Sequence, residues 1–318
     1  MKKDITVVEV CPRDGWQNHK IPISTETKIK YIKQMIDYGA ESFDLVSFVS
    51  PKWVPQMKDA AEVLQESKKY AAELGKDIEF MALALNDKGI ENALKAGATS
   101  IQFVISASEE HNKRNSNRTI EESLANFKTM ASAVKGVKMT LALACGLGSP
   151  FGDEVPADRV KYLCEEALNV GVTRIGLGDT AGVSNPVHTK EIIRALKTIC
   201  DVSQIGIHLH DTYGMGLANA YAAVEEGITA IDAAAGGLGG CPFVPGAKGN
   251  IATEDLVYML HAMGIIRDMT WIKYWAWSVP CVTTFKRRRP AVLLRLVKVS
   301  NAKKIQLQEV KNETINDG

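Results

Sequence analysis

The sequence lacks the features that mark membrane and secreted proteins. Its 318 residues contain no run of about 18 apolar residues, so we expect no transmembrane helix. The apolar run near the N-terminus is short and is interrupted by Glu9, unlike that of a signal peptide. The six cysteines are scattered without a CxxC pair, which favours reduced thiols over a disulfide framework. These absences predict a cytoplasmic protein.

A strong net charge is also lacking. The formal net charge is +1, so nothing indicates a nucleic-acid partner. The charge is unevenly placed, because residues 265–318 hold eleven Lys and Arg against four Asp and Glu, whereas the rest of the chain has a net charge of −6. With 46% hydrophobic residues, the chain is long enough for a large core, built as two domains or as one large α/β barrel.

Short β-branched runs alternate with longer amphipathic runs along most of the chain. The predicted strands are 5–10, 42–49, 78–85, 100–106, 138–144, 173–178, 205–210 and 229–234. The predicted helices are 24–39, 58–74, 87–96, 120–135, 157–170, 186–199, 216–226 and 252–264. Eight such units, with strands apolar on both faces, predict an α/β fold of the (β/α)8 TIM-barrel type. An open doubly wound sheet is the alternative, but no glycine-rich dinucleotide loop follows the first strand.

Local signals mark the ends of the first and last helices. Ser24 is expected to cap the first helix and Gly39 to end it. Thr253 is expected to cap the last helix, and Gly264 to end it. The barrel can close at this point, which predicts a catalytic domain over 1–265 and an atypical basic and aromatic extension.

Two histidines stand at the end of the seventh strand, in the stretch IGIHLHDTYG. Residues two apart in a strand point to the same face, so His208 and His210 would face one point in space. Metal binding or catalysis is one reading of this pair, and two buried core histidines are the other.

Other polar residues gather where the predicted strands end, and active sites of (β/α)8 barrels lie at that rim. These residues are Arg13, Asp14, Asp44, Asp179, Cys241 and Asn250. Asp14, His208 and His210, with an oxygen from Asn250, would suit an octahedral Mg²⁺ or Mn²⁺ ion. Arg13 would supply positive charge or form a salt bridge. Cys241 lies among glycines. It is interpreted either as a proton donor on a mobile loop or as a small buried residue in a glycine-rich turn.

Several long motifs resemble those of the hydroxymethylglutaryl-CoA lyases, which are metal-dependent TIM-barrel enzymes related to Claisen-type synthases. The motifs are VEVCPRDGWQN, SFVSPKWVPQM, GLGDTAGV, HLHDTYGMGLAN and GLGGCPFVPGAKGNIATEDLVYML, and the resemblance runs from about Thr6 to Ile265. It implies an acyl-CoA substrate, a metal held by the four ligands above, roles for Arg13 and Cys241, and supporting roles for Asp179 and Asp44. It also places Gln17 and Lys20 in substrate binding and allows a homodimer.

The implied reaction cleaves the C2–C3 bond of a 3-hydroxyacyl thioester. Asp14 or His208 would take the hydroxyl proton, and acetoacetate would leave. Arg13 would stabilise the thioester enolate, and Cys241 would protonate it to acetyl-CoA. A Claisen synthase and a catalytically impaired CoA- or metal-binding homologue are the alternatives. The synthases of the family usually show HxHND and lack the GLGGCP loop, which favours the lyase.

Three departures from the family pattern bear on this prediction. Asp44 stands where the family has Glu, and the shorter carboxylate predicts a loss of reach to Arg13 or to a metal-bound water. Thr140 and Ala142 stand where the family has Arg and Tyr, which predicts a larger and less polar pocket. Residues 266–318 are basic and rich in tryptophan, which would suit an anionic partner or a membrane surface, a disordered extension or a reading-frame error.

Overall fold

A computed structural model describes residues 5–240 and 249–266. Eight parallel strands form a closed barrel in which each strand pairs with its neighbours in sequence and β1 pairs with β8. The strands are β1 (Thr6–Glu9), β2 (Ser42–Ser47), β3 (Glu79–Leu83), β4 (Ser100–Ser106), β5 (Lys138–Ala144), β6 (Arg174–Asp179), β7 (Ile205–Leu209) and β8 (Ala230–Ala233). The predicted TIM barrel is therefore confirmed.

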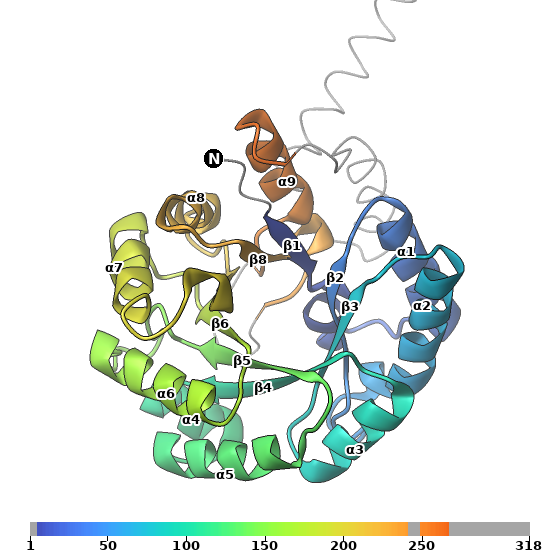
Figure 1. Cartoon of the computed structure of the whole chain (residues 1–318), viewed down its shortest axis with the longest axis horizontal. Coiled ribbons are helices and arrows are strands. Elements are labelled where there is room, and N and C mark those ends of the chain that lie inside the picture. Colours follow the sequence, from blue (N-terminus) through green and yellow to red (C-terminus); the bar gives the residue numbers. More distant parts are fainter. Residues whose placement is uncertain (1–4, 241–248, 267–318) are drawn as a thin grey trace, which may run out of the picture.

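Helices surround the strands on the outside, as Figure 1 shows. They are α1 (Thr25–Asp37), α2 (Ala60–Glu73), α3 (Asp87–Ala96), α4 (Glu109–Ser116), α5 (Ile120–Ala133), α6 (Ala157–Asn169), α7 (Pro186–Leu196), α8 (Gly216–Glu226) and α9 (Thr253–Ala262). Side chains such as Ile175, Leu177 and Ile207 point outward from the strands and are buried against these helices. The main hydrophobic core thus lies between the barrel and the helical layer.

One helix, α4, was missed by the pattern of apolar residues. Its sequence EEHNKRNS contains no apolar residue, so hydrophobic periodicity cannot reveal it. The backbone N–H of His111 donates to Ser108 Oγ at 3.0 Å, which caps the helix at its start.

The predicted ends of the first helix are confirmed, but one predicted cap is wrong. The N–H of Thr27 donates to Ser24 Oγ, and Gly39 adopts the left-handed conformation that follows α1, with φ of 100°. At α9, however, Ala252 occupies the N-cap position and Thr253 is the first helical residue. The Thr253 hydroxyl instead donates to a carboxylate oxygen of Glu9 at 2.8 Å, which draws it into the protein.

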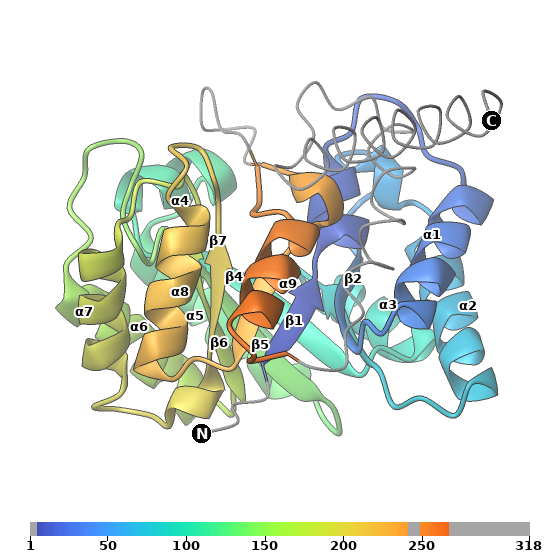
Figure 2. The same cartoon turned by 90° about the horizontal axis from the view of Figure 1, so that it is seen from above.

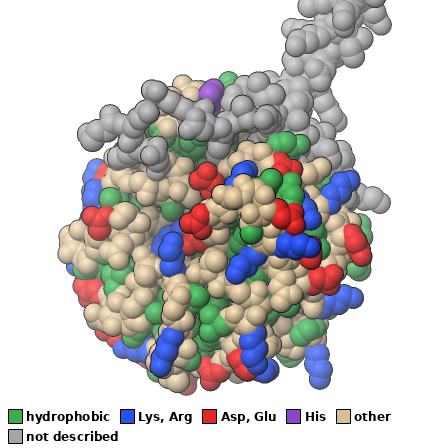
Figure 3. Space-filling model, turned by 45° about the vertical axis from the view of Figure 1, so that its right-hand side comes forward, with side chains coloured by type: hydrophobic (Ala, Val, Ile, Leu, Met, Phe, Trp, Pro, Cys, Tyr) green, Lys and Arg blue, Asp and Glu red, His purple; other side chains and the backbone are tan. Residues whose placement is uncertain are grey.

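The strands end on one side of the molecule, where the loops that carry the predicted site gather (Figure 2). On the face drawn in Figure 3, acidic and basic side chains are interspersed. Within the described ranges no helix is long and apolar enough to cross a membrane. Cys241 and all but the first residue of the predicted extension lie outside the described residues.

Candidate metal centre and active-site rim

Asp14, His208 and His210 come together at the rim of the barrel. One ligand atom from each lies within 4.8 Å of the others, so the three could hold a metal ion. Asp14 belongs to a π-helical turn, Cys11–Gly15, that directly follows β1, and π-helical geometry is frequent at functional sites. The Nε2 atoms of the two histidines are 3.3 Å apart, so both rings point to one place.

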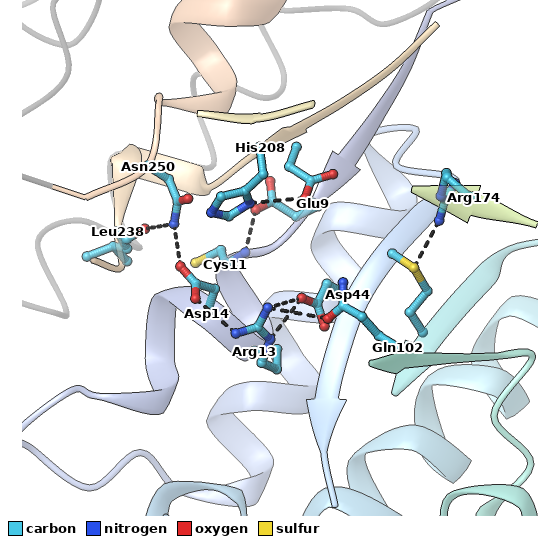
Figure 4. A network of polar contacts seen from close by, with 12 residues as sticks. Glu9, Cys11, Arg13, Asp14, Asp44, Gln102, Arg174, His208, Leu238 and Asn250 are labelled. Atoms are coloured by element: carbon cyan, nitrogen blue, oxygen red, sulfur yellow. Dashed lines mark hydrogen bonds and ion pairs between the residues drawn. The ribbon is translucent and has the colours of Figure 1, made fainter. Parts of the chain in front are cut away.

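Asn250 joins this cluster through its side-chain amide. Its Nδ2 donates to Asp14 Oδ2 at 2.7 Å and to the carbonyl oxygen of Leu238 at 2.8 Å. Asn250 also forms an antiparallel bridge with His210, which brings the loop after β8 against the end of β7. Figure 4 shows Asn250 and Asp14 side by side. Because both hydrogen bonds use the nitrogen, the side-chain oxygen is the atom that could coordinate a metal.

Asp232 on β8 was missed by the sequence reasoning. Its Oδ2 lies 3.0 Å from Nδ1 of His208, so the carboxylate holds one ring nitrogen while Nε2 faces the cluster. Such a pair fixes the tautomer and orientation of a metal-binding histidine. The available signal was a single carboxylate in TAIDAA, a strand otherwise made of small and apolar residues.

The two histidines differ in their electrostatic surroundings. Burial opposes protonation of His208, but the hydrogen bond to Asp232 and its charge outweigh that effect and raise the pKa of His208. Burial and the nearby charge of His208 lower the pKa of His210 to about 4. The neutral ring of His210 is the form that binds a metal.

Arg13 forms an ion pair with Asp44, which corrects the expectation that the shorter side chain would not reach. The Nε atom of Arg13 donates to Asp44 Oδ2 at 2.8 Å, and Nη1 donates to Asp14 Oδ1 at 2.9 Å. Figure 4 shows Arg13 between these two carboxylates. Burial works against the guanidinium charge, but Asp44 and Asp14 more than offset it and raise the pKa of Arg13. The shorter carboxylate reaches because Arg13 extends toward β2 from the turn after β1.

Asp179 at the end of β6 organises the loop that follows its strand. Its two carboxylate oxygens accept the backbone N–H groups of Val183 at 2.9 Å and Ser184 at 3.2 Å. Burial raises the pKa of Asp179 to about 6, although these hydrogen bonds favour the charged form.

The predicted substrate-binding residues fall in two places. Gln17 is partly buried just after the π-helical turn, and Lys20 is exposed a few residues further on. Thr140 and Ala142 lie on β5 and line a cavity inside the barrel, together with Arg13 and His208.

Glu9 is a second residue that the sequence reasoning missed, and its side chain forms hydrogen bonds with the segments that carry the rim residues. Its carboxylate accepts the backbone N–H of Cys11 at 2.9 Å and of Ala235 at 3.0 Å, in addition to the Thr253 hydroxyl. This buried group therefore ties the turn that carries Asp14 to the loop after β8. In the sequence it stands out only as a charge inside an apolar strand.

The fold and this site define a (β/α)8-barrel protein with a candidate divalent-metal centre at the carboxyl ends of its strands. The model of the HMGL-like family matches residues 4–278, and the chain belongs to that family. The predicted family resemblance is thus confirmed.

Individual relatives agree with this assignment. The hydroxymethylglutaryl-CoA lyase YngG of Bacillus subtilis is 40% identical over 83% of this chain and 87% of its own length. The crystal structure of the Bacillus subtilis HMG-CoA lyase superposes with a TM-score of 0.85 at 36% identity, covering 93% of this chain and 98% of that chain. An HMG-CoA lyase from Acinetobacter baumannii, in complex with coenzyme A and 3-methylmalate, gives a TM-score of 0.85 at 35% identity, covering 93% and 95%. The protein is accordingly an enzyme of the lyase type.

Proposed function

We propose that the protein cleaves 3-hydroxy-3-methylglutaryl-CoA, or a related 3-hydroxyacyl-CoA, to acetyl-CoA and acetoacetate or another keto acid. The observation that carries the proposal is the cluster of Asp14, His208 and His210 beside Arg13. The relatives named HMG-CoA lyases support the reaction, and the Acinetobacter baumannii structure with coenzyme A supports an acyl-CoA substrate.

The donor atoms at the rim fit a divalent ion that prefers oxygen and imidazole ligands. Asp14 offers a carboxylate oxygen, His208 and His210 offer Nε2, and Asn250 offers its amide oxygen. This mixed set suits Mg²⁺ or Mn²⁺. When bound, such an ion acidifies a coordinated hydroxyl and holds an adjacent substrate oxygen.

The remaining steps belong to side chains of this chain. Asp14 or His208 takes the proton of the substrate hydroxyl. In the second case Nε2 of His208 accepts the proton instead of serving as a metal ligand, and the Asp232 carboxylate at Nδ1 stabilises the imidazolium. The C2–C3 electron pair then moves into a thioester enolate. Arg13, held by Asp44, stabilises its negative charge. Cys241 delivers a proton to the enolate carbon and so completes acetyl-CoA.

Three further residues position loops or bind substrate and take no part in the proton transfers. They are Asp179, Gln17 and Lys20. Asp179 fixes the loop after β6 beside the cluster, and the exposed Lys20 is suited to the phosphates of coenzyme A. The buried side-chain oxygen of Gln17 has no hydrogen-bond partner among the described residues, so a donor group of the substrate would satisfy it.

We also propose a cytoplasmic location and a homodimer. Cys164 and Cys200 are free thiols, which supports a reducing compartment. Light scattering would test the dimer. The division of the chain at residue 265 is a further proposal, supported by α9, which packs on β1 and α8. Truncation after Ile265 should keep metal binding and most of the thermal stability.

A substrate assay tests the proposed reaction. The full chain with Mn²⁺ should convert 3-hydroxy-3-methylglutaryl-CoA to equal amounts of acetyl-CoA and acetoacetate, whereas Cys241→Ser should lose about 10²–10⁴-fold in turnover because a hydroxyl is a weaker acid than a thiol. Incubation with acetyl-CoA and 2-oxo acids is the control for a synthase. Release of free thiol in that control, without cleavage of the lyase substrate, would reverse the assignment.

A further inference from the structure

The interior of the barrel is unusually open between β5 and β8. Residues paired in register on parallel strands share a face, and one line of register across these four strands joins Ala142, Gly176, Gly206 and Ala230. All four are alanine or glycine, the two residues with the smallest side chains. The interior of a (β/α)8 barrel is normally filled by bulky branched side chains, so this line leaves space where a core would be.

A cavity of about 140 Å³ occupies this space. Arg13 and His208 line it on the side of the metal cluster, and Arg174 and Met81 line it further down the barrel. A cavity of about 150 Å³ can hold a benzene ring, so this one is large enough for a group of roughly six carbon atoms. Because His208 belongs to both, the cavity opens directly onto the cluster.

The charged groups that line the cavity already have partners. Arg174 donates to Glu79 Oε2 at 3.0 Å, and Figure 4 shows its guanidinium directed to a sulfur atom, that of Met81. Arg13 pairs with two carboxylates, as described above, and Asp232 pairs with His208. The uncharged polar residues of the lining are Gln102, Thr140 and Thr180, and the remaining lining residues are apolar side chains such as Val104 and Leu143 with the alanines and glycines. An occupant without charge is therefore favoured over a second carboxylate.

We propose that this cavity receives an alkyl substituent larger than methyl on the hydroxyl-bearing carbon of the substrate. The preferred substrates are then 3-hydroxyacyl-CoA thioesters with a 3-alkyl chain of about four to six carbon atoms. The proposal rests on the proposed function, because the cavity borders His208 and so lies next to a substrate carbon whose hydroxyl is held at Asp14 and His208, where one of its substituents can enter the barrel.

The reaction itself stays balanced with such a substrate. The hydroxyl loses its proton to the base, the C–O bond becomes a carbonyl, and the C2–C3 bond breaks. The electron pair passes to the thioester enolate, which takes one proton at carbon. The products are acetyl-CoA and a ketone that carries the alkyl chain, with no oxidant or further reactant.

The test compares two substrates in wild type and in Ala142→Leu. These are 3-hydroxy-3-methylglutaryl-CoA and its analogue with 3-pentyl in place of 3-methyl. Wild type should cleave the pentyl compound with a kcat/KM at least equal to that for the methyl compound. In Ala142→Leu the ratio of pentyl to methyl kcat/KM should fall at least about tenfold, since extra methylene groups in a filled pocket cost about 10- to 200-fold.

Two further variants guard against trivial causes. Gly206→Val narrows the same cavity from another strand; a Cβ atom at Gly206 would lie 3.5 Å from Ala230 Cβ, an ordinary contact, so folding should survive. Ala72→Leu makes the same change in size as Ala142→Leu on the exposed face of α2 and should leave the ratio unchanged.

Calorimetry with a non-reactive 3-pentyl thioester, in which hydrogen replaces the hydroxyl, gives a readout that does not need turnover. If the thioester binds to wild type but not to Ala142→Leu, the cavity assignment is supported. If in addition neither substrate is cleaved, the proposed reaction is wrong but the cavity assignment still holds. If wild type cleaves the methyl compound but handles the pentyl compound 100-fold less well, and the non-reactive thioester does not bind, the substrate proposal is overturned while the lyase function stands.

Discussion

The two halves of the barrel lining are built differently. From β2 to β4 the interior side chains are sizeable, with Asp44, Met81, Gln102 and Val104 on paired strands. From β5 to β8 the line of register that starts at Val104 runs through alanine and glycine alone, although the neighbouring line that starts at Gln102 carries Thr140 and Arg174. The first half therefore contributes packed side chains and a carboxylate that holds Arg13 in place. The second half contributes both histidines and an open space beneath them.

This contrast shows how one fold can combine rigidity with room for a ligand. The filled half holds the Arg13–Asp44 ion pair, which is largely shielded from water and fixes a positive charge at the rim. The hollow half is less stable for its open interior, because each glycine within a strand lowers the free energy of unfolding by about 0.5–1 kcal/mol relative to alanine. Where the halves meet, between β8 and β1, the buried carboxyl groups of Glu9 and Glu254 accept backbone hydrogen bonds from the loop after β8.

The largest effect is expected from removing a ligand that the hollow half supplies. His210→Ala should lower the affinity for Mn²⁺ by more than the roughly 10–100-fold that loss of an outer partner costs, because an imidazole ligand itself is lost. Calorimetric titration measures it. His188→Ala, on the surface helix α7, is the control and should bind as wild type. Equal Mn²⁺ affinity in His210→Ala would show that the metal lies elsewhere.

Breaking the ion pair of the filled half should cost stability. Asp44→Ala leaves the buried Arg13 without its main partner, and removal of one member of a buried pair typically costs about 3–5 kcal/mol. Urea unfolding gives the change in the free energy of unfolding. Glu91→Ala removes an exposed pair with Lys88 and Lys95 and should cost about 1 kcal/mol or less. Similar losses in both variants would contradict a special role for the pair.

The boundary between the halves should make stability depend on pH. Burial raises the pKa of Glu254 from 4.5 to about 8, so the folded state keeps a proton that the unfolded state loses. The stability that Glu254 contributes to the folded state is thus fully present below pH 4.5. It decreases as the pH rises to about 8 and stays constant at higher pH. Stability changes by about 1.4 kcal/mol for each pH unit that separates the folded and unfolded pKa values of such a group.

Glu254→Gln isolates this contribution, since glutamine does not titrate. Between pH 4.5 and 8, the free energy of unfolding of wild type should fall relative to that of the variant as the pH increases. A difference that stays level over this range would mean that Glu254 is charged in the folded protein.

The smallest expected effect sharpens the contrast within the hollow half. Gly206→Ala should raise the free energy of unfolding by about 0.5–1 kcal/mol, because the new methyl group meets only ordinary contacts. Gly178→Ala is the matched control on the neighbouring strand, since its Cβ would lie 3.0 Å from the Leu143 carbonyl oxygen and should destabilise. Thermal unfolding of both variants measures the difference. Stabilisation by both would mean that the backbone there adapts freely.

The sequence was enough to predict the elements that depend on short-range patterns. Ser24 and Gly39 bound their helix as expected, and the two-residue spacing placed His208 and His210 on one face. These signals work because strand and helix periodicities, and caps, are set by residues within a few positions of one another. The polar α4 escaped the same reasoning because it has no apolar stripe.

The meeting of distant side chains was decided only by the closed barrel. Thr253 was expected to cap its own helix, yet its hydroxyl bonds to Glu9, 244 residues earlier in the chain. Asp232 meets His208, and Asp44 reaches Arg13, only because strand register and the turn after β1 set those distances. The cavity likewise follows from four small residues that fall on one line of register. Short-range patterns determine which face a side chain takes, but pairing across the barrel determines which neighbour it finds there.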